Sequence, residues 1–141
     1  METEFNVRVY GVCIHNNKLL ILKEPFAGSI IFKLPGGGLE FGEGPVECLQ
    51  REFKEELNLT ITDIEPFYIQ KNYVKSAVKN NKQLVLLYFT CKILNLESLQ
   101  IMDSTIQEVI WQDISDDCIL DLPIDQEMFQ FLLKKSKFNK K

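Results

Sequence analysis

The sequence lacks any long hydrophobic run. The longest stretch of large apolar residues spans only positions 84–89, whereas a helix needs about 20 apolar residues to cross a bilayer. The N-terminus, Met1-Glu2-Thr3-Glu4, has no basic start and no apolar segment behind it, so we expect no signal peptide. These absences predict a cytoplasmic protein without a membrane partner.

Residues that commonly bind zinc or form disulfides are also scarce. His15 is the one histidine, and the four cysteines, at positions 13, 48, 91 and 118, include no CxxC pair. Two of the cysteines fall in apolar stretches. We therefore expect small, buried, reduced cysteines, and neither a zinc site nor a disulfide framework.

Basic charge is sparse outside the C-terminus. The formal net charge is −4, but residues 134–141 hold five lysines and no acid, which leaves eleven basic and twenty acidic residues, or −9, in the rest. An acidic body argues against a nucleic-acid partner. The lysine tail is typical of a helix C-terminus followed by a frayed end.

The length and element order predict one α+β domain over residues 1–141. Strand-like runs occupy positions 7–14, 18–23, 30–34, 61–74, 83–94 and 109–111, with asparagine-rich turns at 15–17 and 79–82. Helical spacing appears at 45–57 and 124–135, and the glycine run after Pro35 predicts a loop. This order predicts a central mixed sheet covered by helices.

The first predicted helix has clear ends and one apolar stripe. Pro45 suits the first helical position, and Asn58 suits a left-handed stop. The stripe recurs every three or four residues, at Val46, Leu49, Phe53 and Leu57.

Three acids crowd one flank of this helix. At 100° per residue, Glu52, Glu55 and Glu56 share the flank beside the stripe. Glu52 and Glu56 are an i,i+4 like-charge pair, which costs about 0.2–0.5 kcal/mol, and all three lie near the negative end of the helix dipole. A solvated acidic face is one explanation, and a bound cation that neutralises the cluster is the other.

The residue types favour a hard cation. Carboxylate ligands without histidine or thiolate select Mg²⁺ or Mn²⁺. The run Gly36-Gly37-Gly38 lets the backbone approach a metal–phosphate assembly closely, although no P-loop pattern follows it. Arg51 lies eight residues after Glu43 and is suited to a bidentate pair with it.

These residues match a known pattern. Gly37, five residues, Glu43, seven residues, and then Arg51-Glu52-Phe53-Lys54-Glu55-Glu56-Leu57-Asn58-Leu59 resembles the Nudix box of the MutT/Nudix hydrolases. The family usually has glycine where this chain has Asn58, the next best residue for a left-handed stop. The resemblance implies an α/β/α sandwich with a central mixed sheet, and metal-dependent hydrolysis of a nucleoside diphosphate linked to another moiety.

The resemblance also implies roles for individual residues. Glu52 and Glu56 match the main metal-binding glutamates, and Glu55 matches a third that binds metal or helps to activate water. Gly36 would offer a carbonyl to the metal, and Arg51 with Glu43 would orient helix and loop. Glu108 is our candidate for an acid outside the box, although an exposed loop acid is an equal alternative. Candidate substrate contacts are Gly37, Gly38, Lys23, Phe32 and Tyr73.

The box does not specify a substrate. A proline and a tyrosine that mark ADP-ribose and dinucleoside-polyphosphate hydrolases are not in register, because Lys75 and Ala77 stand there. Nucleoside triphosphates and nucleotide sugars are therefore the favoured classes. A non-catalytic Nudix-fold nucleotide-binding or regulatory module is the alternative, and a homodimer is compatible with the resemblance.

Overall fold

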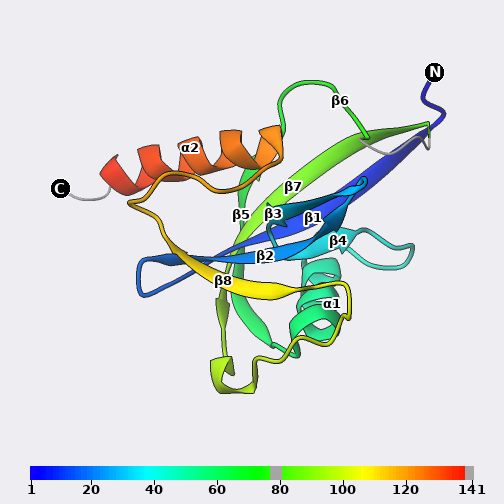
Figure 1. Ribbon diagram of the computed structural model, residues 1–141. Coiled ribbons are helices and arrows are strands. Elements are labelled where there is room, and N and C mark those ends of the chain that lie inside the picture. Colours follow the sequence, from blue (N-terminus) through cyan, green and yellow to red (C-terminus); the bar gives the residue numbers. More distant parts are fainter. Residues whose placement is uncertain (77–80, 139–141) are drawn as a thin grey trace.

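A β-sheet forms the centre of the molecule, and two helices cover it (Figure 1). The structure, a computed structural model, describes residues 1–76 and 81–138, without the side chains of 137 and 138. The helices are α1 (Pro45–Leu57) and α2 (Pro123–Phe138), with a short 3-10 turn at Leu96–Ser98. Within the described ranges one sheet of eight strands contains β1 (Glu4–His15), β2 (Lys18–Phe26), β3 (Ser29–Lys33), β4 (Gly36–Gly38), β5 (Ile61–Ile69), β6 (Val74–Lys75), β7 (Lys82–Ile93) and β8 (Glu108–Asp113).

The sheet is mixed because its two long strands run parallel. β1 pairs with β7 from Glu4 opposite Lys82 to Cys13 opposite Cys91. The strand order is β3-β2-β1-β7-β5, and β8 adds to β2. These other pairings are antiparallel.

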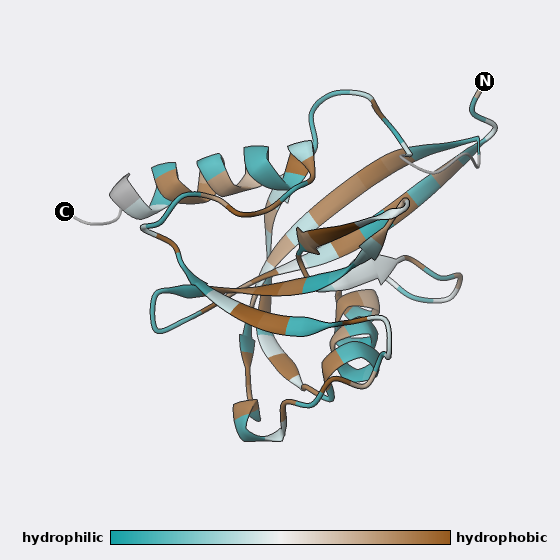
Figure 2. Cartoon of the chain, viewed as in Figure 1, coloured by the Kyte–Doolittle hydropathy of each residue, from teal (hydrophilic) through white to brown (hydrophobic). Residues whose placement is uncertain are grey.

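Alternation along β1 directs side chains into two separate cores. Val9 packs in the core under α1 with Leu49 and Phe53, whereas Tyr10 packs in the core under α2 with Met128 and Phe129. The helices therefore lie on opposite faces of the sheet (Figure 1), and much of β7 between them is hydrophobic (Figure 2). The predicted fold class, an α/β/α sandwich around a mixed sheet, is confirmed.

Helix α1 begins and ends as predicted, but its buried face is rotated. Asn58 adopts the left-handed conformation, with φ of 59°, and its N–H points to the Lys54 and Phe53 carbonyls. Val46, expected in the apolar stripe, is 38% exposed, and Cys48 is buried instead. The rotation also brings Glu56 into the buried face. Leu49, Phe53 and Leu57 of the predicted stripe are buried as expected, and Val46, in the first turn, is the member that is wrong.

The predicted loop at the glycine run is wrong. Gly36–Gly38 form β4, which pairs antiparallel with Arg8, Val9 and Tyr10 of β1. Gly36 has φ of 141°, and a Cβ there would lie 2.1 Å from the Val9 carbonyl oxygen. Glycine is thus needed for this close strand pairing, and not for a turn.

The predicted strand at 61–74 is two strands. β5 ends at Ile69, and β6 resumes at Val74. The Gln70 side chain takes over the pairing between them, because its amide accepts from Leu86 N and donates to Leu84 O. When a side chain takes the hydrogen bonds that a neighbouring strand's backbone would make, the strand can end without a glycine or proline in the sequence to mark the break.

The remaining elements agree with prediction. Asn16 and Asn17 have positive φ in the β1–β2 turn, and the four cysteines are free. The second asparagine turn includes Lys79 and Asn80, which lie outside the described residues. No helix in the described part of the chain is long and apolar enough to span a membrane.

Candidate active site

The C-terminal half of α1 lies against β4, and we call this region the α1–β4 corner (Gly36–Gly38, Glu43 and residues 51–56). Gly36 N donates to Glu56 Oε1 at 3.0 Å, and Arg51 Nη2 donates to the Gly38 carbonyl at 3.1 Å. A Cβ at position 37 would lie 2.5 Å from Glu52 Oε1. Because β4 has no side chains, the carboxylates of Glu52 and Glu56 can directly contact its backbone.

Arg51 is the centre of the corner's charge network. Its Nε and Nη2 donate to the two oxygens of Glu43 at 3.0 and 2.8 Å, the bidentate pair expected from the spacing. Its Nη1 lies 3.0 Å from Glu52 and 3.2 Å from Glu55. Hydrogen bonding from Arg51 lowers the pKa of Glu43 to about 2. Arg51 thus supplies part of the positive charge that the acidic flank requires.

Glu56 is the acid that Arg51 does not neutralise. It is 6% exposed, and burial raises its pKa to about 8, although Lys33 and the Gly36 N–H act in the opposite direction. A buried carboxylate is costly unless it is paired. Glu56 therefore either holds a proton or needs a further cation nearby.

A divalent cation fits the chemistry of the corner. Among the described residues no three histidine, cysteine, aspartate or glutamate side chains already form a metal-binding group, because Glu52 and Glu55 turn to Arg51 while Glu56 turns to Gly36. The donor set nevertheless consists of carboxylates, which suit Mg²⁺ or Mn²⁺. The burial of the Glu56 carboxyl is the observation that favours a cation, because a bound metal would stabilise its ionised form.

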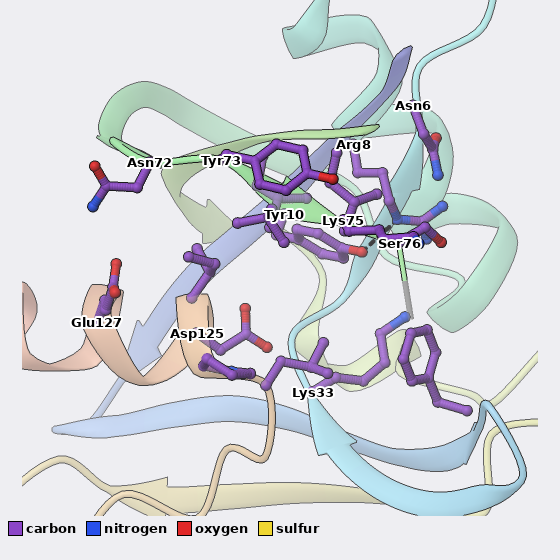
Figure 3. Close-up of a pocket in the computed structure, with 17 residues that line it drawn as sticks. Asn6, Arg8, Tyr10, Lys33, Asn72, Tyr73, Lys75, Ser76, Asp125 and Glu127 are labelled. Carbon is purple, nitrogen blue, oxygen red and sulfur yellow. Dashed lines mark hydrogen bonds between the residues drawn. The ribbon is translucent and has the colours of Figure 1, made fainter. Parts of the chain in front are cut away.

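A pocket of about 690 Å³ opens on the α2 side of β1 (Figure 3), and we call it the α2 pocket. Arg8 and Tyr10 of β1, Lys33 of β3 and Tyr73 line it from the sheet, and Asp125 lines it from α2. Its volume lies in the usual range for small-ligand sites.

Two cations connect the pocket to the corner. Arg8 Nε donates to the Tyr10 hydroxyl at 2.6 Å. Burial lowers the pKa of Arg8, but Tyr10, Glu52 and Glu56 together raise it above its usual value. Lys33 Nζ pairs with Glu24 at 2.8 Å, and its charge acts on both Glu56 and Asp125. The basic end of the pocket therefore faces the carboxylates of α1.

The other predicted site residues lie in several places. Tyr73 is 60% exposed and lines the pocket. Phe32 packs against the core under α2. Lys23 of β2 is paired with Phe32 of β3 on one side and with Glu108 of β8 on the other. Glu108 is exposed at the start of β8. The structure therefore brings Tyr73 to the pocket, but it does not place Lys23, Phe32 or Glu108 among the described residues that line it.

Arg8, Tyr10 and Asp125 are among the pocket residues that were missed from the sequence. Arg8 and Tyr10 alternate with Val7 and Val9 on β1, so period-two spacing was a usable signal. Asp125 falls in the first turn of α2, where an acid is ordinarily explained by the helix dipole. Its burial arises only from tertiary packing.

Comparison with known proteins gives a consistent assignment. The model of the NUDIX domain matches residues 5–134. A NUDIX hydrolase from Nitrosomonas europaea has the same fold, with a TM-score of 0.77 at 20% identity over 94% of this chain and 90% of that one. A UDP-X diphosphatase has a TM-score of 0.74 at 19% identity, over 99% of this chain and 66% of that one. An ADP-ribose pyrophosphatase from Streptococcus suis has a TM-score of 0.70 at 18% identity, over 94% of this chain and 92% of that one.

The family match extends over most of the chain and includes the whole α1–β4 corner. It confirms the predicted family and supports the predicted class of enzyme, a hydrolase that acts on pyrophosphate bonds. The chain belongs to the Nudix hydrolase family.

Proposed function

We propose that this chain is a metal-dependent pyrophosphohydrolase that cleaves a nucleoside diphosphate linked to another moiety. The observation that carries the proposal is the meeting of opposite charges where the α2 pocket adjoins the α1–β4 corner. Arg8 and Lys33 supply cations for phosphate oxygens, and Glu52 and Glu56 supply carboxylates for a metal. A polyphosphate needs both kinds of neutralisation.

The carboxylates divide into holding and orienting roles. Glu52, Glu55 and Glu56 would hold Mg²⁺ or Mn²⁺, with the Gly36 carbonyl as a further oxygen donor. When bound, the metal neutralises the pyrophosphate and lowers the pKa of a water molecule. Arg51 and Glu43 fix β4 against α1, since Arg51 contacts both Gly38 and Glu43. Gly37 leaves the space that Glu52 occupies.

Glu55 is the proposed acceptor of the proton from the attacking water. Its side chain is 58% exposed, against 15% for that of Glu52, and Arg51 donates to one of its oxygens. Glu56 is buried and already accepts from Gly36, which suits a fixed ligand better than a proton carrier. Glu108, outside the box, is a second candidate for this role.

Nucleoside triphosphates and nucleotide sugars are the proposed substrate classes, which the pocket's size accommodates. Solved structures named for UDP-X and for ADP-ribose share the fold at under 20% identity, so neither name transfers by itself. A non-catalytic binding module is the second candidate. The observation that favours it is that the described side chains do not already form a three-acid metal group.

A hydrolysis screen separates these two functions. Purified protein with Mg²⁺ is incubated with a panel of nucleoside diphosphate derivatives, and released nucleotide and phosphate are measured. We expect turnover of at least one compound that stops on metal removal and in Glu55→Gln and Glu56→Gln. Glu97→Gln, an exposed acid of the 3-10 turn, is the matched control and should retain turnover. Binding without turnover of any compound would favour the module.

A further inference from the structure

Two of the four cysteines lie side by side in the sheet. Cys13 of β1 and Cys91 of β7 are direct partners at one end of the parallel pairing between these strands. Both side chains pack in the core under α1, so they point from the same face of the sheet. β1 and β7 run along each other through the centre of the molecule (Figure 1). The fold therefore brings together two thiols that are far apart in the sequence.

The spacing of neighbouring strands suits a covalent link between these two positions. Paired strands lie about 4.7–4.9 Å apart, and the Cα atoms of disulfide-bonded cysteines usually lie about 4.4–6.8 Å apart. The two thiols are free in the structure, and hydrogen bonding between them lowers the pKa of Cys13 and raises that of Cys91. The strands therefore already have the separation that a disulfide requires.

Burial limits which oxidants can reach the pair. Cys13 is 1% exposed and Cys91 is 5% exposed. A large oxidant would have to unfold part of the sheet, whereas hydrogen peroxide is small enough to enter through local openings. A single buried thiol is usually inert. A buried pair differs, because the second sulfur can trap the first oxidation product as a disulfide.

We propose that Cys13 and Cys91 are a site of oxidative modification, at which hydrogen peroxide joins them in a disulfide that tethers β1 to β7. The Cys13 sulfur attacks one peroxide oxygen, the O–O bond breaks, and a sulfenic acid and one water molecule form. The Cys91 sulfur then attacks the Cys13 sulfur, the S–O bond breaks, and a second water molecule leaves. The two thiols thus lose two electrons and two protons to one peroxide molecule, which becomes two water molecules.

The other two cysteines provide an internal comparison. Cys48 of α1 is buried as fully as Cys13, but its thiol lies 3.8 Å from the Gly37 carbonyl oxygen and 3.5 Å from that of Gly38. Cys118 is half-buried in the segment between β8 and α2. Neither is paired with a cysteine in the sheet. Burial alone would therefore protect Cys48 and the pair equally, whereas the proposed site predicts that only the pair is linked.

Mass spectrometry of the folded chain after limited treatment with hydrogen peroxide tests the proposal independently of hydrolysis. The peroxide is removed with catalase, and the chain is then denatured and alkylated. We expect the intact chain to lose two hydrogen atoms, a proteolytic peptide to join Cys13 to Cys91, and Cys48 to remain open to alkylation. Dithiothreitol should restore both thiols. Cys13 and Cys91 that are still alkylated after treatment, or that carry sulfinic acid without a link, would overturn the proposal.

Thermal melting of matched variants tests the tether itself. The link closes a long loop, so oxidation should raise the melting temperature of the wild type by about 5–10 °C. Cys91→Ala leaves Cys13 without a partner and should show neither the link nor the rise. Cys48→Ala removes an equally buried thiol and should keep both. An equal rise in Cys91→Ala would contradict the proposal, and the peptide that joins the two cysteines in the wild type decides the outcome if a variant does not fold.

Discussion

The α1–β4 corner and the α2 pocket are encoded in the sequence in different ways. The corner consists of residues within one short stretch, from Gly36 to Glu56, so fixed spacing along the chain reveals it. The pocket is assembled from β1, β3, the segment before β6 and the start of α2. Chemistry that depends on local spacing can be predicted from sequence, whereas selectivity that depends on packing between distant segments requires the structure.

The largest expected effect lies in the corner. Glu56→Gln preserves the size of the side chain and an acceptor for the Gly36 N–H, but it removes the charge that would bind a cation. We expect turnover with Mg²⁺ to fall by about 10²–10⁴-fold, with no loss of thermal stability because a buried acid, whose pKa of about 8 keeps it protonated at neutral pH, is replaced by a neutral amide of the same size. Unchanged steady-state turnover would exclude Glu56 from the metal site.

Arg51→Met should have the next largest effect. It leaves Glu43, Glu52 and Glu55 without their shared cation and releases the Gly38 carbonyl. We expect turnover to fall by about 10²-fold, since orienting contacts of this kind are worth 10–100-fold or more. The pH profile of turnover should shift as well, because the Glu43 pKa is low only while Arg51 donates to it. A loss of turnover with an unshifted profile would count against an orienting role.

Gly37→Ala tests the contact between strand and helix. The new Cβ would lie 2.5 Å from Glu52 Oε1, so the carboxylate must move. We expect turnover to fall by about tenfold, with a higher Mg²⁺ concentration needed for half-maximal turnover as the sign of a displaced ligand. The neighbouring change Gly38→Ala places its Cβ 3.7 Å from Arg8 Nη1, an ordinary contact. Its loss of turnover should be smaller, and equal losses would show that Glu52 is not the cause.

The smallest effect concerns the pocket, and it is one of stability. The pKa of Asp125 is about 6 in the fold against 3.8 ordinarily, because burial outweighs Tyr88 and Lys33. Between pH 4 and 6 the native state therefore holds a proton that the unfolded chain has released, and the free energy of unfolding falls as pH rises. At about 1.4 kcal/mol per pKa unit, the cost above pH 6 is at most about 3 kcal/mol.

Asp125→Asn should remove this pH dependence. In urea unfolding, the variant should gain stability relative to the wild type as pH rises from 4 to 6, and the difference should stay constant above pH 6. A difference that is independent of pH would mean that Asp125 ionises normally. A more stable variant would show that the fold retains this buried acid at a cost in stability.

The sequence predicted most of the fold and one of the two regions. Strong local signals, such as Asn58 at the end of α1 and Asn16-Asn17 in the first hairpin, gave the correct elements. The errors occurred where contacts with residues distant in the sequence determine the secondary structure. β1 supplies the pairing that turns three glycines into a strand, and the Gln70 side chain divides β5 from β6.

The candidate residues show the same division. The Arg51–Glu43 pair follows from an eight-residue spacing that the helix geometry fixes. The burial of Glu56 could not be predicted, because the stripe was anchored on Val46 rather than on Cys48. Asp125 could not be recognised either, since its environment is formed by Tyr88 of β7 and Lys33 of β3, which lie far from it in the sequence.

The central claim is that the carboxylates of α1 hydrolyse a pyrophosphate bond with a divalent metal. The most direct test compares wild type and Glu56→Gln in hydrolysis assays with a panel of nucleoside triphosphates and nucleotide sugars, with and without Mg²⁺. We expect cleavage by the wild type only with metal, and almost none by the variant. Cleavage that persists in the variant or without metal would contradict the claim.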